Sequence, residues 1–148
     1  MRAREIAVEF PTVTLDTGAL EAARLMADRQ LPGLVVVDDD GLPYSVLPGS
    51  QVLNFAIPSY VQEDPSLARV YDEAAADRLG ARLEAHTVRE LMPAKPHELP
   101  VVESDDTVME IAAMMAGMHT PLVAVVDDGE MLGVVTLSAL LARVLPPA

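Results

Sequence analysis

Acidic side chains gather at two places in the sequence where a bound cation is chemically conceivable. Residues 38–40 read "DDD" before Gly41, and residues 127–130 read "DDGE". Carboxylate oxygens are the ligands that Mg²⁺ and Ca²⁺ prefer in proteins. Neither run has the ligand spacing of an EF-hand calcium loop. We therefore interpret both runs as solvated turns between apolar segments rather than as metal sites.

The residues that most often perform catalysis form no recognisable motif. His86, His97 and His119 are far apart, and no pair has the spacing of metal ligands on a helix. The chain has no cysteine, which excludes disulfides, thiolate metal sites and thiol catalysis. There is also no nucleophile elbow and no Walker-type phosphate loop. We expect a protein that is not an enzyme and holds no metal.

The charge balance and the length of the apolar runs exclude further classes of function. The net charge is −13, whereas nucleic-acid binding needs a basic surface. No apolar run approaches the roughly 20 residues of a membrane-spanning helix. The N-terminal "MRAREIAVEF" lacks the apolar core of a secretory signal. We expect a cytoplasmic protein that binds no nucleic acid and does not insert into a membrane.

The sequence contains an internal repeat. "EAARLMADRQLPGLVVVDD" (residues 21–39) aligns with "EIAAMMAGMHTPLVAVVDD" (residues 110–128), with about half of the positions identical. The match continues with four further pairs: Gly41/Gly129, Val46/Val134, Ser50/Ser138 and Leu53/Leu141. Because there are only two copies, a pseudo-twofold domain is favoured over a solenoid. The copies are placed at residues 1–57 and 86–148.

Each copy predicts the element order β-α-β-β-α. Residues 12–15 and 100–102 are β-prone, and apolar residues then recur at helical spacing. Thr107 and Glu110 form the capping box of the second of these helices. Asp-Gly pairs between apolar runs predict hairpins at residues 34–47 and 122–135. Final helices are expected at residues 49–56 and 137–144, which makes the fold class α+β.

A connector, residues 58–85, separates the two copies. We expect residues 58–65 to be a linker, followed by one helix capped by Asp64 with Pro65 at its first position. Gly80 weakens that helix. The helix is interpreted as a packed connector, with a docking helix for a partner as the alternative. Its expected apolar face consists of Leu67, Val70, Tyr71, Ala74, Ala75, Leu79 and Leu83, and the opposite face carries Arg69, Asp72, Glu73 and Arg82.

With the duplication, two motifs resemble those of a tandem pair of cystathionine β-synthase (CBS) domains. They are "TVRELM" at residues 87–92 and "VVDDGEMLGVVT" at residues 125–136. The resemblance covers most of the chain. It implies a regulatory module that binds adenine nucleotides or related ligands in clefts between paired sheets and dimerises as a flat disc.

The family marks its ligand cleft with Gly, two apolar residues, Thr or Ser, two further residues, and Asp. In this pattern the hydroxyl and the carboxylate bind the ribose. The second copy keeps Gly133 and Thr136 but has Ala139 in place of Asp, whereas the first copy has Pro48 in place of Thr and Gln51 in place of Asp. Thr136 is alternatively only a helix cap, and Pro48 suits a helix start.

The resemblance places the candidate ligand-binding residues mainly in the second copy. His119 precedes Pro121 near the position where the family places a group facing phosphate; the alternative is a histidine at a helix C-terminus. Arg2, Arg4, Arg89 and Lys95 are the basic groups near the repeat starts. The complete candidate set is Thr136, Gly133, Val134, Ser138, His119, Pro121, Ser50 and Gln51.

Two functional hypotheses follow. The first is a sensor of ATP, ADP, AMP or S-adenosylmethionine that forms a homodimer and controls an unidentified effector protein, an enzyme or a transporter, in trans. The second is a structural dimerisation or docking module whose clefts no longer bind a ligand. The dimer surface is expected on apolar helix faces that include Met114, Met115, Met118, Leu140, Leu141 and Val144.

Overall fold

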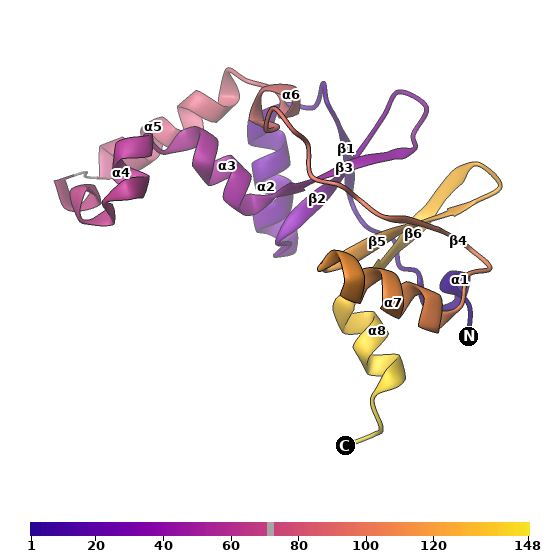
Figure 1. Cartoon of the computed structure of the whole chain (residues 1–148). Coiled ribbons are helices and arrows are strands. Elements are labelled where there is room, and N and C mark those ends of the chain that lie inside the picture. The colour runs from indigo at the N-terminus through magenta and orange to yellow at the C-terminus, as the bar shows by residue number, and fades with distance from the viewer. Residues whose placement is uncertain (71–72) are drawn as a thin grey trace. The chain divides into compact units, whose positions relative to one another are not determined.

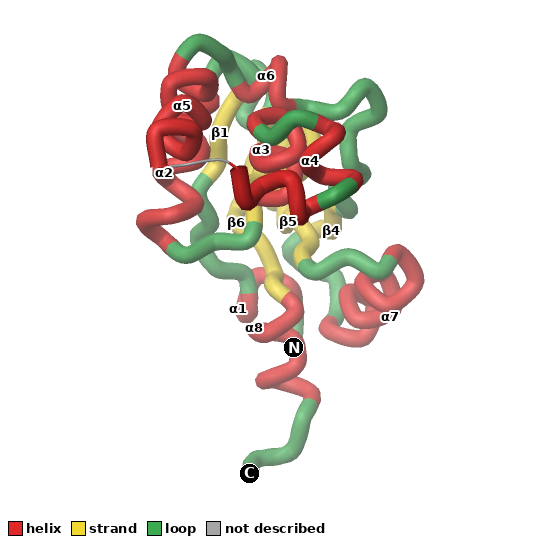
Figure 2. The backbone as a smooth tube through the Cα atoms, turned by 90° about the vertical axis from the view of Figure 1, so that its left-hand side faces the viewer, coloured by secondary structure: helices red, strands yellow, loops and turns green. Residues whose placement is uncertain are grey.

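The computed structural model describes residues 1–70 and 73–148 (Figure 1), and Figure 2 distinguishes helices, strands and loops by colour. The described residues divide into two compact units. The repeat-2 unit consists of residues 1–10, 37–45 and 98–148, and the repeat-1 unit consists of residues 11–36 and 46–97. Two three-stranded sheets are formed, with strand orders β1-β2-β3 and β4-β5-β6. The predicted α+β class is confirmed.

In the second copy the chain forms β4 (Val101–Glu103), α7 (Val108–Met118), β5 (Leu122–Asp127), β6 (Glu130–Thr136) and α8 (Leu137–Val144). β4 pairs with β5 in parallel, and β5 pairs with β6 antiparallel. Asp128 and Gly129 both have positive φ, 52° and 80°, as a tight hairpin turn of the primed type requires. The predicted capping box is confirmed, because Thr107 Oγ1 accepts a hydrogen bond from the backbone N–H of Glu110 at 3.2 Å.

The first copy forms β1 (Thr12–Thr14), α2 (Ala19–Arg29), β2 (Gly33–Val37), β3 (Pro43–Pro48) and α3 (Gly49–Ala56). β2 is buried along its whole length, which explains its unbroken apolar run. α2 and α7 end in the same way, with Gln30 and His119 in the left-handed conformation. The predicted order of elements is therefore confirmed in both copies.

Each compact unit contains one short helix that precedes a copy of the repeat in the sequence. α1 (Ala3–Ile6) belongs to the repeat-2 unit, where the backbone N–H of Val108 donates to the carbonyl oxygen of Met1 at 3.1 Å. α6 (Val88–Leu91) belongs to the repeat-1 unit, where the N–H of Ala19 donates to the carbonyl oxygen of His86 at 2.9 Å. The first residues of each copy therefore pack with the other copy's elements, so the compact units cut across the repeats seen in the sequence.

The connector differs from the single helix expected. It forms α4 (Ser59–Glu63), the 3₁₀ helix η1 (Pro65–Val70) and α5 (Glu73–Glu84), so the expected linker is partly helical. Asp64 ends α4, and its carboxylate accepts hydrogen bonds from the backbone N–H and the hydroxyl of Ser66. This side-chain turn competes with a continuous α-helix. α5 runs through Gly80 without interruption. Tyr71 and Asp72 lie outside the described residues.

The expected apolar face of the connector is buried only at its C-terminal end. Leu83 is 7% exposed and packs in the core of the repeat-1 unit, with Leu79 partly buried against it. Leu67 is 38% exposed, and Ala74 is also exposed. The expectation of one continuous apolar face is therefore wrong at Leu67 and Ala74, because η1 and α5 do not form one helix on which these residues would share a side.

Two residues of the expected dimer surface lie in a core instead. Met115 and Leu140 are each only 4% exposed and pack with Ile111, Val123 and Val135 in the repeat-2 unit. α7 and α8 turn these side chains toward the sheet, since each helix has to bury one face against it. Met118, Leu141 and Val144 do lie exposed, as expected.

Candidate functional site

Thr136 stands where β6 ends and α8 begins. Its Oγ1 accepts a hydrogen bond from the backbone N–H of Ala139 at 3.2 Å, so Thr136 caps the helix. Thr136 lies opposite Leu122 in the sheet, and the N–H of Leu137 donates to the carbonyl oxygen of Pro121 at 2.9 Å. The fold therefore brings Thr136 and Pro121 together. We call this place, where the start of β5 meets the start of α8, the Thr136 junction.

Two further candidates surround this junction. Ser138 is exposed in the first turn of α8. His119 is exposed as the C-cap residue of α7, two residues before Pro121, with Thr120 between them. The Thr120 hydroxyl donates to the carbonyl oxygen of Leu122 at 2.8 Å. His119 and Ser138 therefore both lie exposed on the two segments that meet at the junction.

Gly133 and Val134 contact the N-terminal segment. The backbone N–H and carbonyl of Val134 form hydrogen bonds of 2.9 and 2.8 Å with the carbonyl and N–H of Val8. A Cβ atom at Gly133 would lie only 2.5 Å from the Val8 carbonyl oxygen. The glycine thus permits Val8 to lie against the outer side of β6. Sequence reasoning missed this role of Val8, although a glycine within an apolar strand signals a close backbone approach.

The equivalent junction in the repeat-1 unit lacks the same chemistry. Pro48 is the N-cap residue of α3, and the N–H of Gly49 donates to the Pro32 carbonyl oxygen at 2.8 Å, which repeats the backbone pattern of the second copy. The Gln51 amide Nε2 donates to the carbonyl oxygen of Leu91 at 2.9 Å. Ser50 is exposed. Here the backbone geometry and the exposed serine are retained, whereas Pro48 has no hydroxyl group and the Gln51 amide is already hydrogen-bonded.

Two of the four basic groups near the repeat starts form ion pairs, and a third donates to a backbone carbonyl. Arg4 forms an ion pair with Asp105, and Arg2 Nη1 donates to the Asp105 carbonyl oxygen at 2.9 Å. Arg89 forms the equivalent ion pair with Asp16, at 3.2 Å. These arginines already have partners beside α1 and α6, which leaves them less suited to bind a phosphate group.

Carboxylates at equivalent positions of α1 and α6 have lowered pKa values. A hydrogen bond from the backbone N–H of Arg2 lowers the pKa of Glu5 below its ordinary value. The hydrogen bond with the His86 side chain lowers the pKa of Glu90. Both carboxyl groups are therefore ionised at neutral pH and stabilise the starts of their short helices.

The acidic runs form turns. Asp38 Oδ1 accepts hydrogen bonds from the backbone N–H groups of Asp40 and Leu42, at 2.9 and 3.0 Å. Asp127 Oδ1 accepts one from the Ser104 hydroxyl at 2.7 Å. Among residues 1–70 and 73–148, no three His, Asp or Glu side chains lie close enough together to hold a metal ion. The carboxylates of Asp38 and Asp127 therefore accept hydrogen bonds at the turns to which they belong.

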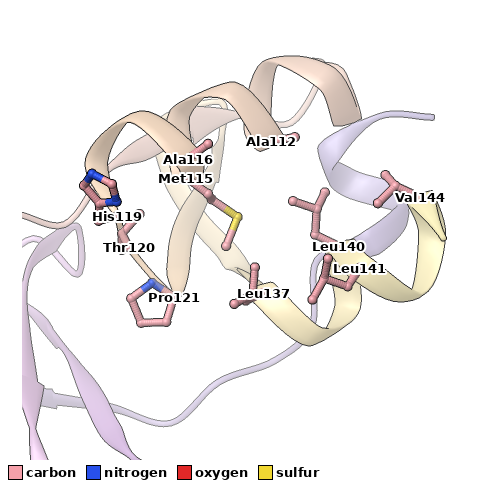
Figure 3. A pocket seen from close by; sticks show the side chains of 10 residues that line it. All are labelled: Ala112, Met115, Ala116, His119, Thr120, Pro121, Leu137, Leu140, Leu141 and Val144. Carbon is pink, nitrogen blue, oxygen red and sulfur yellow. The ribbon is translucent and has the colours of Figure 1, made fainter.

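An open groove of about 450 Å³ lies between α7 and α8 in the repeat-2 unit (Figure 3). Met115, Leu137 and Leu140 point into it, and His119 stands with Thr120 and Pro121 at one end. Its remaining lining is apolar, which suits an apolar surface better than a charged nucleotide. The lining residues are Ala112, Met115, Ala116, His119, Thr120, Pro121, Leu137, Leu140, Leu141 and Val144.

The chain belongs to the CBS-domain family, whose profile matches residues 3–47 and 88–146. It is similar to a CBS domain-containing protein of unknown function from Kribbella flavida, whose crystal structure superposes with a TM-score of 0.92 at 55% sequence identity and 99% coverage of both chains. The resemblance to a tandem CBS pair is thereby confirmed.

More distant structures share the fold. The CBS domain of a membrane protein from Sphaerobacter thermophilus is 25% identical, with a TM-score of 0.75, covering 98% of this chain and 88% of that one. CBSX2, solved in complex with AMP, is 18% identical, with a TM-score of 0.66 and coverage of 96% and 94%. None of these three proteins is named as an enzyme. No curated protein sequence matches the chain.

Within residues 1–70 and 73–148, none of the helices has both the length and the apolar character needed to cross a bilayer.

Proposed function

We propose that this chain is a regulatory module that binds an adenine nucleotide or S-adenosylmethionine at the Thr136 junction and controls an effector protein in trans, as a homodimer. Thr136 carries the proposal. It supplies a hydroxyl group at the strand end where the family pattern places a ribose ligand, with His119 and Ser138 on adjacent segments. The AMP complex of CBSX2 supports this ligand class within the same fold.

The sensing mechanism is a shift of population. A ligand changes the output only if it binds one conformation of the module more tightly than another. In the second copy the junction keeps its hydroxyl, whereas in the first copy Pro48 has none and the Gln51 amide is bound to Leu91. We therefore assign the ligand to the repeat-2 unit.

The alternative function is a structural dimerisation module that binds no nucleotide. Specific observations favour it: Ala139 and Gln51 both replace the carboxylate of the family pattern. A charge-assisted hydrogen bond contributes about 1.5–3 kcal/mol, so its loss weakens ribose binding by one to two powers of ten.

A thermal-shift panel with AMP, ADP, ATP and S-adenosylmethionine separates the two functions, with GMP as the base control. A ligand at about 100 times its dissociation constant adds about 2.7 kcal/mol to the free energy of unfolding. For a chain of this size that corresponds to a rise in Tm of about 5–10 °C. The sensor predicts such a rise with at least one adenosine compound and a smaller one with GMP. No rise with any of the four supports the structural module.

A further inference from the structure

The short helices α1 and α6 are held by the same backbone contacts in their two units. The N–H of Val88 in α6 donates to the carbonyl oxygen of Thr17 at 2.8 Å, and the N–H of Ala3 in α1 donates to that of Asp106 at the same distance. The next residue of each helix is an arginine that forms an ion pair with an aspartate. Because these contacts repeat, residues at equivalent positions of the two copies can be compared one by one.

One side-chain hydrogen bond of the first copy has no counterpart in the second. The Gln51 amide Nε2 donates to the carbonyl oxygen of Leu91, the last residue of α6, at 2.9 Å in a partly buried position. In the second copy Ala139 stands at the position of Gln51, and Ile6, the last residue of α1, stands at the position of Leu91. A methyl side chain has no donor, so Ala139 cannot form the equivalent bond to Ile6.

The Ile6 carbonyl oxygen belongs to the surroundings of the Thr136 junction. Ile6 packs in the same core as Leu140, the residue that follows Ala139, and the Ala139 N–H donates to Thr136 Oγ1. Ala139 is half-buried, as Gln51 is in the first copy. Among the residues that the structure describes, the backbone contacts of α1 include no hydrogen bond to the Ile6 carbonyl oxygen. The junction therefore extends toward an acceptor whose counterpart in the first copy has a donor.

The kind of group that fits this place follows from the acceptor. A carbonyl oxygen only accepts hydrogen bonds, so the group that meets it has to carry an N–H or an O–H. The oxygens of an ionised phosphate group are acceptors and do not suit it. A ribose hydroxyl is a donor, and the family pattern places the ribose at this position of the helix. In the first copy the donor is the amide nitrogen of Gln51.

We propose that the Ile6 carbonyl oxygen accepts a hydrogen bond from a ribose hydroxyl of the ligand, and that the Gln51 amide occupies the equivalent place in the first copy. This deepens the proposed function and rests on it. The backbone carbonyl then takes over the accepting role of the carboxylate that Ala139 lacks. One chain binds one ribose ligand, which holds α1 in the way in which Gln51 holds α6.

Calorimetric titration of the wild type with AMP and with 2′,3′-dideoxy-AMP tests the need for a ribose hydroxyl. AMP should bind about tenfold more tightly, because the dideoxy compound leaves the acceptor without its donor. The carbonyl ¹³C resonance of Ile6, in a chain labelled at its isoleucine carbonyls, reports on the acceptor itself. We expect this resonance to move on addition of AMP, while that of Ile57 in the repeat-1 unit stays in place as the internal reference.

Two reciprocal substitutions test the comparison of the copies. Ala139→Gln gives the second copy the amide of the first and should weaken AMP binding at least about tenfold, because the amide occupies the place of the hydroxyl. Gln51→Ala is the matched variant and should lower the Tm by about 2–4 °C through the loss of one hydrogen bond. Its affinity for AMP should stay within about threefold of the wild type. If circular dichroism shows that Ala139→Gln does not fold, the Ile6 resonance of the wild type decides.

The contrary outcomes separate the inference from the proposed function. If AMP binds while the Ile6 resonance stays in place, or binds a folded Ala139→Gln as tightly as the wild type, the ribose acceptor lies elsewhere and the proposed function stands. An unchanged Tm in Gln51→Ala shows that the amide does not hold α6, which overturns the comparison. A wild-type chain that binds neither AMP nor S-adenosylmethionine removes the proposed function, and the inference with it.

Discussion

Because Gly133 has no side chain, the N-terminal segment at Val8 can lie directly against β6. The Val8 carbonyl oxygen lies where a Cβ atom would collide with it, at 2.5 Å. The contact at this distance is with backbone, which cannot move aside as a flexible side chain can. The glycine of the family pattern is thus explained by packing in this chain.

Gly133→Ala is expected to lower the free energy of unfolding by about 1–3 kcal/mol, because the new methyl group overpacks the contact with Val8. Gly80→Ala is the matched control, since a Cβ atom at Gly80 meets nothing within 4 Å in the middle of α5. It should raise the free energy of unfolding by about 0.5–1 kcal/mol. Urea denaturation measures both variants. Equal effects of the two substitutions would show that the Val8 contact is not tight.

Pro48 takes the place of Thr136 in the first copy without a hydroxyl group, so α3 has no side-chain cap at its start. It serves as the N-cap residue of α3, and the following Gly49 N–H finds its partner in the Pro32 carbonyl, as Leu137 does with Pro121. The backbone of the junction is therefore the same with proline as with threonine, and what differs is the hydroxyl group.

Among the elements, those specified by local chemistry could be predicted from the sequence. The turn at Asp128 and Gly129, the cap at Thr107 and the bounds of α3 and α8 are each set by residues within a few positions. These signals depend on conformational preference and helical spacing, which a single sequence shows directly. The repeat predicted the final helix twice, as α3 and α8.

The elements set by distant contacts could not be predicted in this way. α1 and α6 pack with elements about a hundred and about seventy residues away, through hydrogen bonds such as those of Ala3 with Asp106 and of Val88 with Thr17. The repeat alignment assigns each short helix to its own copy. No local sequence pattern therefore indicates that the helix packs with elements of the other copy. The burial of Met115 was missed for a similar reason, because an apolar helix such as α7 does not reveal which side faces the sheet.

α5 is expected to be part of the core of the repeat-1 unit. Leu83→Ala should lower the free energy of unfolding by about 2–4 kcal/mol, since it removes a buried leucine from the contact with α2 and α3. Leu67→Ala, in the exposed η1, is the control and should change it by less than about 0.5 kcal/mol. Thermal or urea unfolding tests this pair. A Leu83→Ala variant as stable as the control would show that α5 is only loosely attached.

The two copies of the repeat have the same order of elements, but they differ in what covers their helices and in the side chains of their junctions. The repeat-1 unit has its helices covered by α5 and its junction hydroxyl replaced by Pro48. The repeat-2 unit keeps Thr136 and an open apolar face. We propose that the second copy binds the ligand, while the first copy supplies a stable counterpart.

We propose that the Thr136 junction binds an adenosine ligand. Calorimetric titration of AMP tests it most directly, with Thr136→Val, Thr136→Ser and Ala139→Asp beside the wild type. Thr136 also caps α8, so Thr136→Val costs about 1 kcal/mol of stability. Thr136→Ser is the matched control, because it keeps the hydroxyl group for both roles.

We predict that AMP binds about tenfold more weakly to Thr136→Val, through the loss of one neutral hydrogen bond. Thr136→Ser should bind within about threefold of the wild type. Ala139→Asp restores the carboxylate of the family pattern at the third position of α8 and should bind at least about tenfold more tightly. If Thr136→Val binds AMP as the wild type does and Ala139→Asp binds no more tightly, Thr136 is only a helix cap and the sensing site is not at this junction.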